Sequence, residues 1–197
     1  MILYLTIIGA CMLLISAIVT LVTACDFFYV LGMSAIAVVA VILLDAIVAT
    51  VSRLLPEKCA KHDQKIFTVS AKEKKFYEKL KIRKWKDKVP EIGHFTGFRK
   101  NKIADPKSVE YLDRFLLEAC YGEIGHFFSF FFGFFILLLF PISEIWLGVA
   151  IPVACVNAVL NLPSLFILRY NSYKLEILRK SNLKKQSRLS AESSSMA

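Results

Sequence analysis

Lysine and arginine are absent from two long parts of this chain, residues 1–52 and residues 115–168. Of the 25 basic residues, eighteen fall between Arg53 and Arg114 and the other seven fall between Arg169 and Arg188. Hydrocarbon excludes charge, and loops that stay in the cytoplasm retain an excess of lysine and arginine. The separation therefore predicts a membrane protein whose basic segments all lie on the cytoplasmic side.

The chain also lacks the composition of a soluble domain. Apolar residues make up 56% of it and its mean hydropathy is +0.56, whereas soluble domains are about 45–50% apolar. Because this excess is gathered in blocks, we expect an all-α, multi-pass membrane protein with about four transmembrane helices. The basic segments that carry the net charge of +9 border these blocks. The charge therefore indicates membrane lipids or an anionic carrier or cofactor as partner, and no nucleic acid.

Several familiar chemical signatures are missing. The five cysteines form no CxxC pair, and their odd number gives no disulfide framework. The sequence contains no GxSxG, Walker A, GxGxxG or HExxH motif. None of the three histidines has an aspartate four residues later, the spacing of soluble glycerolipid acyltransferases. We expect neither a metal nor a bound cofactor.

Four apolar stretches have the length of a membrane span, and they pair into two hairpins. A hydrocarbon core of about 30 Å needs roughly 20 helical residues. The predicted spans are residues 1–24, 27–51, 127–142 and 145–168. The predicted organisation is an N-terminal hairpin in 1–52, a basic interfacial insertion in 53–124, a second hairpin in 125–168, and a basic tail in 169–197 with a disordered end.

The positive-inside bias places both termini and the insertion in the cytoplasm. Only Asp26 and Glu144 then remain in the outer loops. Residues 22–25 resemble a lipoprotein processing site, which raises the question of whether Cys25 is lipidated. A second apolar stretch follows at once and no basic segment precedes the first, so we favour an uncleaved span.

The insertion contains helix signals of its own. Ser70 and Glu73 form a capping box, and a basic amphipathic stretch follows it up to Trp85. This stretch suits the headgroup layer of a membrane, although a solvated helix with a small packed face would show the same pattern. Asp105 and Pro106 then predict the N-cap and first residue of another helix, which Gly122 and Gly125 kink as it enters the bilayer; residues 92–100 between the two helices are expected to form an irregular loop.

The sharpest chemical constellation is Glu118, Glu123 and His126. Glu123 and His126 are three residues apart and share a helix face. A carboxylate that contacts a histidine fixes its tautomer, so His126 is a candidate general base for a hydroxyl nucleophile. Alternatively, both glutamates are solvated and the histidine is an interfacial anchor. A di-iron site needs the Glu-x-x-His motif twice, and one copy is present.

Polar residues inside the spans point to the same region. Asp45 and Asn161 each lie eight residues from a basic boundary, about 12 Å along a helix, and Asn157 is one turn deeper. Ionisable groups in a bilayer are costly and mark functional sites. We expect Asp45, His126 and Asn161 to share a polar pocket that opens to the cytoplasm. Both residues also have a structural explanation. Asp45 could form a hydrogen bond between helices, and Asn161 could donate to the backbone carbonyl that Pro163 leaves without a partner.

The order of several short motifs resembles the glycosyl-4,4'-diaponeurosporenoate acyltransferases, a family that includes the enzyme finishing the staphylococcal carotenoid staphyloxanthin. The similarity runs from about Arg53 to Arg179 and leaves most of the N-terminal hairpin outside. The motif residues are Arg83-Lys84-Trp85-Lys86, Pro90, Gly93, Phe98, Glu118, Glu123, His126, Asn161, Pro163, Arg169-Tyr170-Asn171 and Lys174-Leu175.

This resemblance implies transfer of a fatty acyl group from a donor, such as acyl-CoA or acyl carrier protein, to a sugar hydroxyl of a membrane glycolipid. His126 would be the base, oriented by Glu123 or Glu118. Substrate contacts would come from the remaining site residues, Arg83, Lys84, Trp85, Lys86, Asn161, Arg169, Tyr170 and Asp45. The alternative is a non-enzymatic membrane lipid-binding or scaffold protein, which needs the spans and the basic face but none of the candidate catalytic side chains.

Overall fold

The computed structural model describes residues 2–89 and 103–195, and within them it contains helices and no strand. The predicted all-α class is therefore confirmed. Among these described residues, four helical stretches are long and apolar enough to cross a membrane, and these are Leu5–Thr23, Phe27–Leu54, Val109–Leu138 and Glu144–Glu192. The expected loop at 92–100, together with Pro90, Gly93 and Phe98 of the motif pattern, lies outside the described residues.

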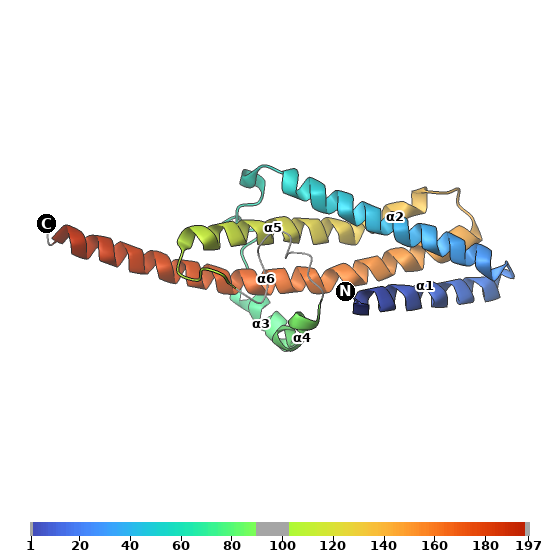
Figure 1. Ribbon diagram of the computed structural model, residues 1–197, viewed down its shortest axis with the longest axis horizontal. Helices are drawn as coiled ribbons and strands as arrows, with labels where there is room; N and C mark the ends of the chain where they lie inside the picture. Colours follow the sequence, from blue (N-terminus) through green and yellow to red (C-terminus); the bar gives the residue numbers. More distant parts are fainter. Residues whose placement is uncertain (1, 90–102, 196–197) are drawn as a thin grey trace. The chain divides into compact units, whose positions relative to one another are not determined.

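Helices α1 (Ile2–Thr23) and α2 (Phe27–Leu54) form the tight hairpin that the sequence predicts (Figure 1). Three residues connect them, and the Asp26 carboxylate accepts the Tyr29 N–H at 2.9 Å at the start of α2. Between the two helices, the buried Ser16 hydroxyl donates to Ser34 Oγ at 2.9 Å. This hydrogen bond satisfies two hydroxyls that would otherwise be costly to bury among apolar side chains.

Helix α5 (Val109–Phe132) begins later than the sequence predicts. Ser108, and not Asp105, is its cap, because the Ser108 hydroxyl accepts the Tyr111 N–H at 3.1 Å. The Asp105 carboxylate instead accepts the N–H groups of Lys107 and Ser108, each at 3.2 Å, and so forms a local turn. Aspartate and serine side chains both accept hydrogen bonds from nearby backbone N–H groups. The sequence pattern of a helix N-cap was therefore compatible with Asp105 and with Ser108.

The helical assignment of α5 continues without a break through Gly122 and Gly125, where the sequence predicted a kink. A Cβ on Gly122 would lie 2.9 Å from Leu168 Cδ1, so this glycine allows another helix to approach closely. The α-helical geometry ends at Phe132, and a 3₁₀ segment, η4 (Gly133–Leu138), continues from it. The regular helix therefore stops before the end of the predicted span at 127–142.

Helix α6 (Glu144–Ser195) is the longest element and contains Pro152 and Pro163. Ser143 caps it by accepting the Trp146 N–H at 3.1 Å. The helix runs through the tail that was expected to be disordered at its end. No glycine or proline follows Pro163, and Leu, Lys, Arg, Gln, Ala and Glu are interspersed among the serines. These are good helix formers, which explains the difference.

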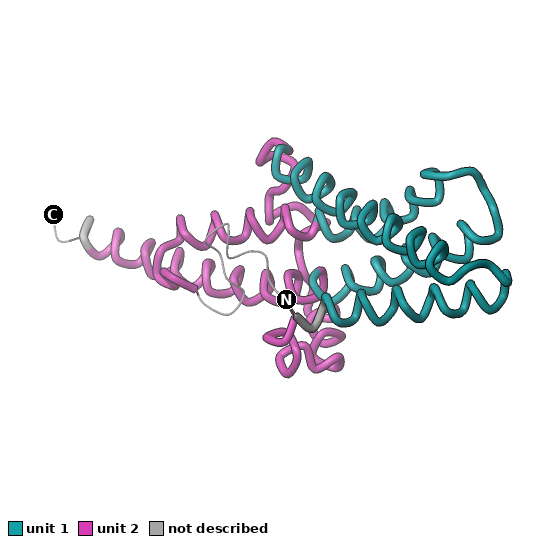
Figure 2. Tube along the Cα trace, turned by 45° about the vertical axis from the view of Figure 1, so that its right-hand side comes forward, with its two compact units in different colours: residues 1–54, 124–164 teal, residues 55–123, 165–197 magenta. Residues whose placement is uncertain are grey.

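The chain divides into two compact units (Figure 2). Unit 1 comprises residues 1–54 and 124–164, and unit 2 comprises residues 55–123 and 165–197. Unit 1 has an apolar core in which α1, α2, η4 and α6 meet around Trp146. Among its described residues, the single lysine or arginine is Arg53. The charge segregation of the sequence is therefore also a segregation between the units.

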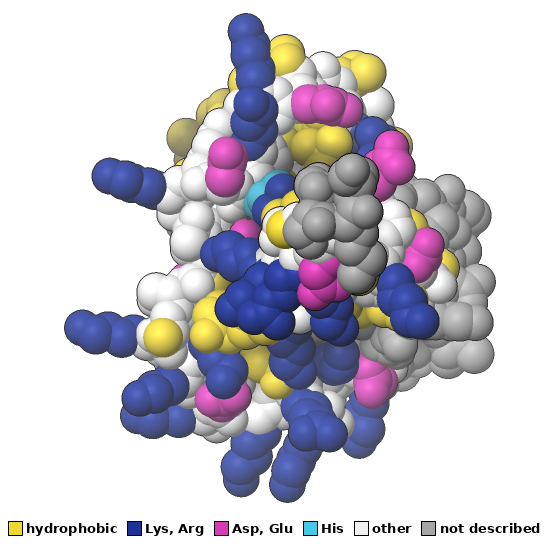
Figure 3. Space-filling model, turned by 90° about the vertical axis from the view of Figure 1, so that its left-hand side faces the viewer, with side chains coloured by type: hydrophobic (Ala, Val, Ile, Leu, Met, Phe, Trp, Pro, Cys, Tyr) yellow, Lys and Arg dark blue, Asp and Glu magenta, His cyan; other side chains and the backbone are white. Residues whose placement is uncertain are grey.

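Unit 2 packs short helices against parts of α5 and α6. These are η1 (Glu57–Cys59), α3 (Ala71–Lys79), α4 (Ile82–Trp85) and η2 (Lys86–Lys88). One apolar cluster joins α3 and α4 to α6 through Tyr77, Ile82 and Ile167, and a second joins α5 to α6 through Leu116 and Leu175. Figure 3 shows many Lys and Arg side chains gathered on one face.

Trp146 provides a test of the unit 1 core. It is fully buried, its indole N–H donates to Leu137 O at 3.3 Å, and its ring meets Phe140 edge-on. Trp146→Ala should lower the free energy of unfolding by about 3–5 kcal/mol, because it leaves a cavity and an unpaired carbonyl. Trp146→Phe should cost less. Denaturant unfolding of the detergent-purified protein measures both, and Leu138→Ala, at a side chain 83% exposed, is the control expected to have little effect.

Candidate active site

Three helices of unit 1 bring Asp45, His126 and Asn161 together, as their expected depth predicts. His126 Nδ1 is 2.8 Å from Asn161 Oδ1, and Asn161 Nδ2 donates to Asp45 Oδ2 at 3.3 Å. Asn157 Nδ2 donates to the other carboxylate oxygen of Asp45 and to Ser129 O, both at 3.3 Å. We refer to these five residues as the His126 cluster.

The hydrogen bonds of Asn161 determine the tautomer of His126. The Asn161 amide nitrogen faces three acceptors, Asp45 Oδ2, Asn157 O and Asn157 Oδ1. Its carbonyl oxygen therefore faces the imidazole, and a carbonyl oxygen can only accept. His126 Nδ1 must then carry the proton and donate it, which leaves the lone pair on Nε2. A neutral histidine held in this way is arranged as a base.

Sequence reasoning missed two members of the surroundings, Ser129 and Gly133. A Cβ on Gly133 would lie 2.6 Å from Asn157 Nδ2, so the amide occupies the space that any other side chain would need. The signal available was a single glycine inside a phenylalanine-rich run.

The sequence left open that Asn161 donates to the backbone carbonyl freed by Pro163, which lies four residues before the proline. In the structure the Asn161 side-chain N–H groups instead face Asp45 and Asn157 O.

Glu118 and Glu123, the predicted carboxylate partners of His126, have hydrogen-bond partners within unit 2. Glu118 accepts from Arg114 at 2.9 Å, one turn away on α5. Glu123, which is 3% exposed, accepts from Arg169 Nη1 at 2.9 Å and from the Ser172 hydroxyl at 3.2 Å. A buried carboxylate gains most from charge-assisted hydrogen bonds, and Arg169 supplies them.

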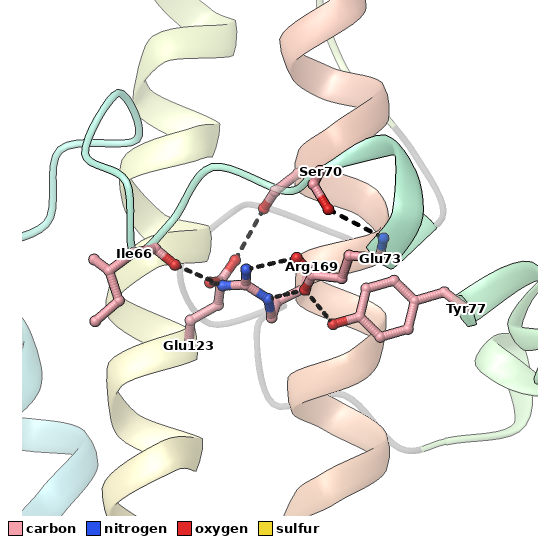
Figure 4. A network of polar contacts seen from close by, with 7 residues as sticks. Ile66, Ser70, Glu73, Tyr77, Glu123 and Arg169 are labelled. Atoms are coloured by element: carbon pink, nitrogen blue, oxygen red, sulfur yellow. Dashed lines mark hydrogen bonds and ion pairs between the residues drawn. The ribbon is translucent and has the colours of Figure 1, made fainter. Parts of the chain in front are cut away.

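Arg169 is the centre of a second polar group, which lies in unit 2 (Figure 4). Its Nε and Nη2 atoms reach the two oxygens of Glu73 at 2.5 and 3.1 Å, and its Nη1 reaches Glu123 and Ile66 O, each at 2.9 Å. The guanidinium is thus engaged by two carboxylates and a carbonyl of the chain itself. The expected contact of Arg169 with a substrate anion would require displacing them, so its geometry favours a structural role.

Glu73 joins this group to the start of α3. The predicted cap is present, since the Ser70 hydroxyl accepts the Glu73 N–H at 3.1 Å. The Tyr77 hydroxyl donates to the Glu73 carboxylate at 2.6 Å. Burial alone would raise the pKa of Glu73, but the hydrogen bonds from Arg169 and Tyr77 and the charge of Arg169 outweigh it and hold this pKa below its ordinary value. Burial and the contact with Glu73 raise the pKa of Tyr77, so its hydroxyl remains a donor.

The other predicted binding residues separate into accessible and packed groups. Arg83 and Lys84 are exposed on α4, and Lys86 is half-buried. Trp85 packs against the α3–α4 cluster and donates its indole N–H to Leu80 O at 2.9 Å. Tyr170 is 4% exposed in the same cluster, and the Lys174 ammonium lies 4.3 Å from the centre of its ring. Tyr170 is therefore a core residue, while Arg83 and Lys84 are open to a ligand.

Unit 2 also contains a cavity of about 450 Å³ that no sequence motif indicated. Its charged and polar lining includes His62, Asp63, Glu176 and Lys180, and its apolar lining includes Leu116. His62 lies 3.3 Å from a Glu176 oxygen. The lining has no excess of positive charge, so it does not favour a ligand rich in phosphate.

Removing the Arg169 guanidinium tests its structural role. Arg169→Met should lower the free energy of unfolding by about 3 kcal/mol, because it leaves Glu123 buried without a cation. The Glu123→Gln, Arg169→Met double variant should recover part of this loss, since position 123 then no longer holds a buried charge without a cation, although Glu73 still lacks its partner. Denaturant unfolding in detergent measures the series. A double variant as unstable as the sum of the singles would contradict the ion-pair explanation.

Acid stability tests the lowered pKa of Glu73. A carboxyl group with a depressed pKa in the folded state stabilises the fold above its unfolded pKa, and this contribution is lost as the pH falls through the folded value. The denaturant concentration at the midpoint of unfolding should therefore be higher for wild type than for Glu73→Gln. The difference should be largest above pH 4.5, the ordinary pKa of a glutamate side chain. The two should converge under stronger acid. A constant difference over the whole range would show that Glu73 acts by packing alone.

Comparison with known proteins adds the family. Residues 62–181, which are 120 of the 197 residues, match the family model described as glycosyl-4,4'-diaponeurosporenoate acyltransferase. No significant match was found among curated proteins or solved structures. The matched region contains His126, Asn157, Asn161 and Arg169, whereas Asp45 precedes it. The chain belongs to the glycosyl-4,4'-diaponeurosporenoate acyltransferase family and is an acyltransferase.

Proposed function

We propose that this acyltransferase moves a fatty acyl group from a thioester donor to a sugar hydroxyl of a membrane glycolipid, with His126 as general base. The observation that carries the proposal is the chain of hydrogen bonds from Asp45 through Asn161 to His126 Nδ1. A base needs a fixed tautomer and a lone pair directed at the hydroxyl. Asn161 supplies the first condition and thereby leaves Nε2 for the second.

In the proposed step, His126 Nε2 accepts the proton of the acceptor hydroxyl while the hydroxyl oxygen attacks the thioester carbonyl carbon. A new C–O ester bond forms, the C–S bond breaks, and the imidazolium returns the proton to the departing thiolate. The products are the acylated glycoside and the free thiol of the donor. During the step Asn161 and the nearby Asp45 carboxylate stabilise the transient positive charge on the imidazole. Acyl-CoA and acyl carrier protein are the proposed donors, because both carry the acyl group as a thioester.

The surroundings of the His126 cluster support a lipid-borne acceptor. Its residues come from helices that are long and apolar enough to cross a membrane. Polar groups at such positions are costly, which indicates a function for them. The family description names a glycosyl carotenoid as acceptor, and a carotenoid glycoside combines an apolar chain with sugar hydroxyls. We also propose that both termini and the basic segments lie on the cytoplasmic side of the cell membrane, as the positive-inside rule implies.

Substitutions in the His126 cluster test the proposal. His126→Ala should reduce acyl transfer at least 100-fold, because a positioned base contributes roughly 10²–10⁴. Asn161→Leu should also reduce it, since the imidazole loses its orienting acceptor. Mass spectrometry of glycolipids incubated with acyl donor and membranes containing each variant measures the ester product, normalised to the amount of folded protein.

Asp45→Ala and Thr50→Ala provide a matched pair on α2. The Thr50 hydroxyl is exposed and donates to Ala46 O within its own helix, so its loss should leave activity unchanged. Loss of Asp45 should reduce turnover more than substrate affinity, because it acts on the transition state through Asn161. Full turnover in His126→Ala would refute the assignment of the base.

A further inference from the structure

The strongest unexplained feature of unit 2 is the density of exposed positive charge between Ser70 and Val89. Figure 3 shows Lys and Arg side chains extending outward from one face. Among the described residues of α3, α4, η2 and their connections, the exposed basic side chains are Lys72, Lys75, Lys79, Lys81, Arg83, Lys84 and Lys88. We refer to these seven side chains as the α3–α4 basic surface. The His126 cluster and the proposed chemistry do not use it.

Most of the acidic groups in the same segment are already neutralised. Glu73 is held by Arg169 through two hydrogen bonds. Glu78 is paired with Lys74 at 3.0 Å, one turn away on α3. Asp87 is the remaining acidic residue of this stretch. Against the seven cations of the α3–α4 basic surface, the segment therefore offers one further carboxylate, that of Asp87, and a large excess of positive charge remains.

Two apolar side chains emerge beside these cations. Phe76 is 49% exposed and Leu80 is 39% exposed. Lys72, Phe76 and Lys79 follow at four- and three-residue intervals, which places them on one face of α3. The buried side of the Phe76 ring contacts Tyr77 and Phe166, with ring centres 5.6 and 6.1 Å apart. Its exposed side is thus presented outward in a fixed position.

The helix that carries this surface is firmly held. Tyr77 is 4% exposed and Ile82 is fully buried in the cluster that joins α3 and α4 to α6. The bidentate contact between Glu73 and Arg169 adds a charged link to α6. A ligand of the α3–α4 basic surface would therefore find it already formed and would not have to pay for folding it.

We propose that the α3–α4 basic surface binds the anionic headgroups of a membrane leaflet and that Phe76 and Leu80 reach into its acyl layer. Lysine next to an anionic leaflet contributes about 1 kcal/mol per residue, and an amphipathic helix inserts its apolar side chains at the same depth. Six of the seven basic residues are lysine. The cores of protein–protein interfaces are depleted in lysine, so a lipid surface fits better than an acidic protein.

Lipid retention by the purified full chain tests this inference without any acyl transfer. Native mass spectrometry of the protein in detergent, with equal amounts of phosphatidylglycerol and phosphatidylcholine, should show preferential retention of phosphatidylglycerol. The Lys72→Gln, Lys75→Gln, Lys79→Gln triple variant should bind phosphatidylglycerol about 100-fold more weakly, since three lysines at the value above correspond to two powers of ten. All three positions are exposed, so the fold should be retained.

The matched control removes the same charge elsewhere in unit 2. Lys184, Lys185 and Arg188 are exposed on α6, and their triple glutamine variant should retain phosphatidylglycerol as wild type does. Phe76→Ser should weaken retention while leaving the preference for anionic headgroups. Equal losses in both triple variants, or equal retention of both lipids by wild type, would overturn the proposal. Binding of an acidic acyl carrier protein that displaces phosphatidylglycerol from this surface would also overturn it.

Discussion

The position of the Asn161 amide is the constraint on which the candidate active site depends. Its two ends have opposite hydrogen-bonding character, so one side chain can satisfy the Asp45 carboxylate and the His126 imidazole at the same time. A polar group among apolar helices is costly unless it is paired. The same pairing that makes the burial of these residues tolerable also sets the protonation pattern of the imidazole. The stability of this part of unit 1 and the arrangement proposed for catalysis therefore have a common origin.

In unit 2 the buried polar groups are paired through full charges. Arg169 meets two carboxylates from different elements, and together they link α3, α5 and α6. The arginine belongs to the family-matched region and looked like an anion site in the sequence. Its ion pairs instead hold α3 against α6, and the outer face of α3 remains exposed. The seven basic side chains on that segment are then available for a membrane surface, because two of the three carboxylates in the segment, Glu73 and Glu78, are already paired.

The sequence predicted those features that depend on neighbours along the chain. Hydropathy located the helices, the short Cys25–Asp26 link predicted the first hairpin, and spacing identified Ser70 as a cap. Depth along each span also predicted that Asp45, His126 and Asn161 converge. Helical periodicity could not identify the partner of His126, because it relates residues of one helix and says nothing about the facing helix. Glu123 shares a face with His126 in the sequence, yet its partners come from α6.

The phenylalanine-rich run from Phe127 to Phe135 contains positions with very different freedom. Phe127, Phe131 and Phe135 are each about half exposed, so other large apolar residues would fit there. Gly133 lies among them, and the Asn157 amide occupies the place of its missing side chain. Every codon change that replaces this glycine introduces a carbon atom at that place. We therefore expect the exposed phenylalanines of this run to accept substitution by other large apolar residues, while Gly133 accepts none.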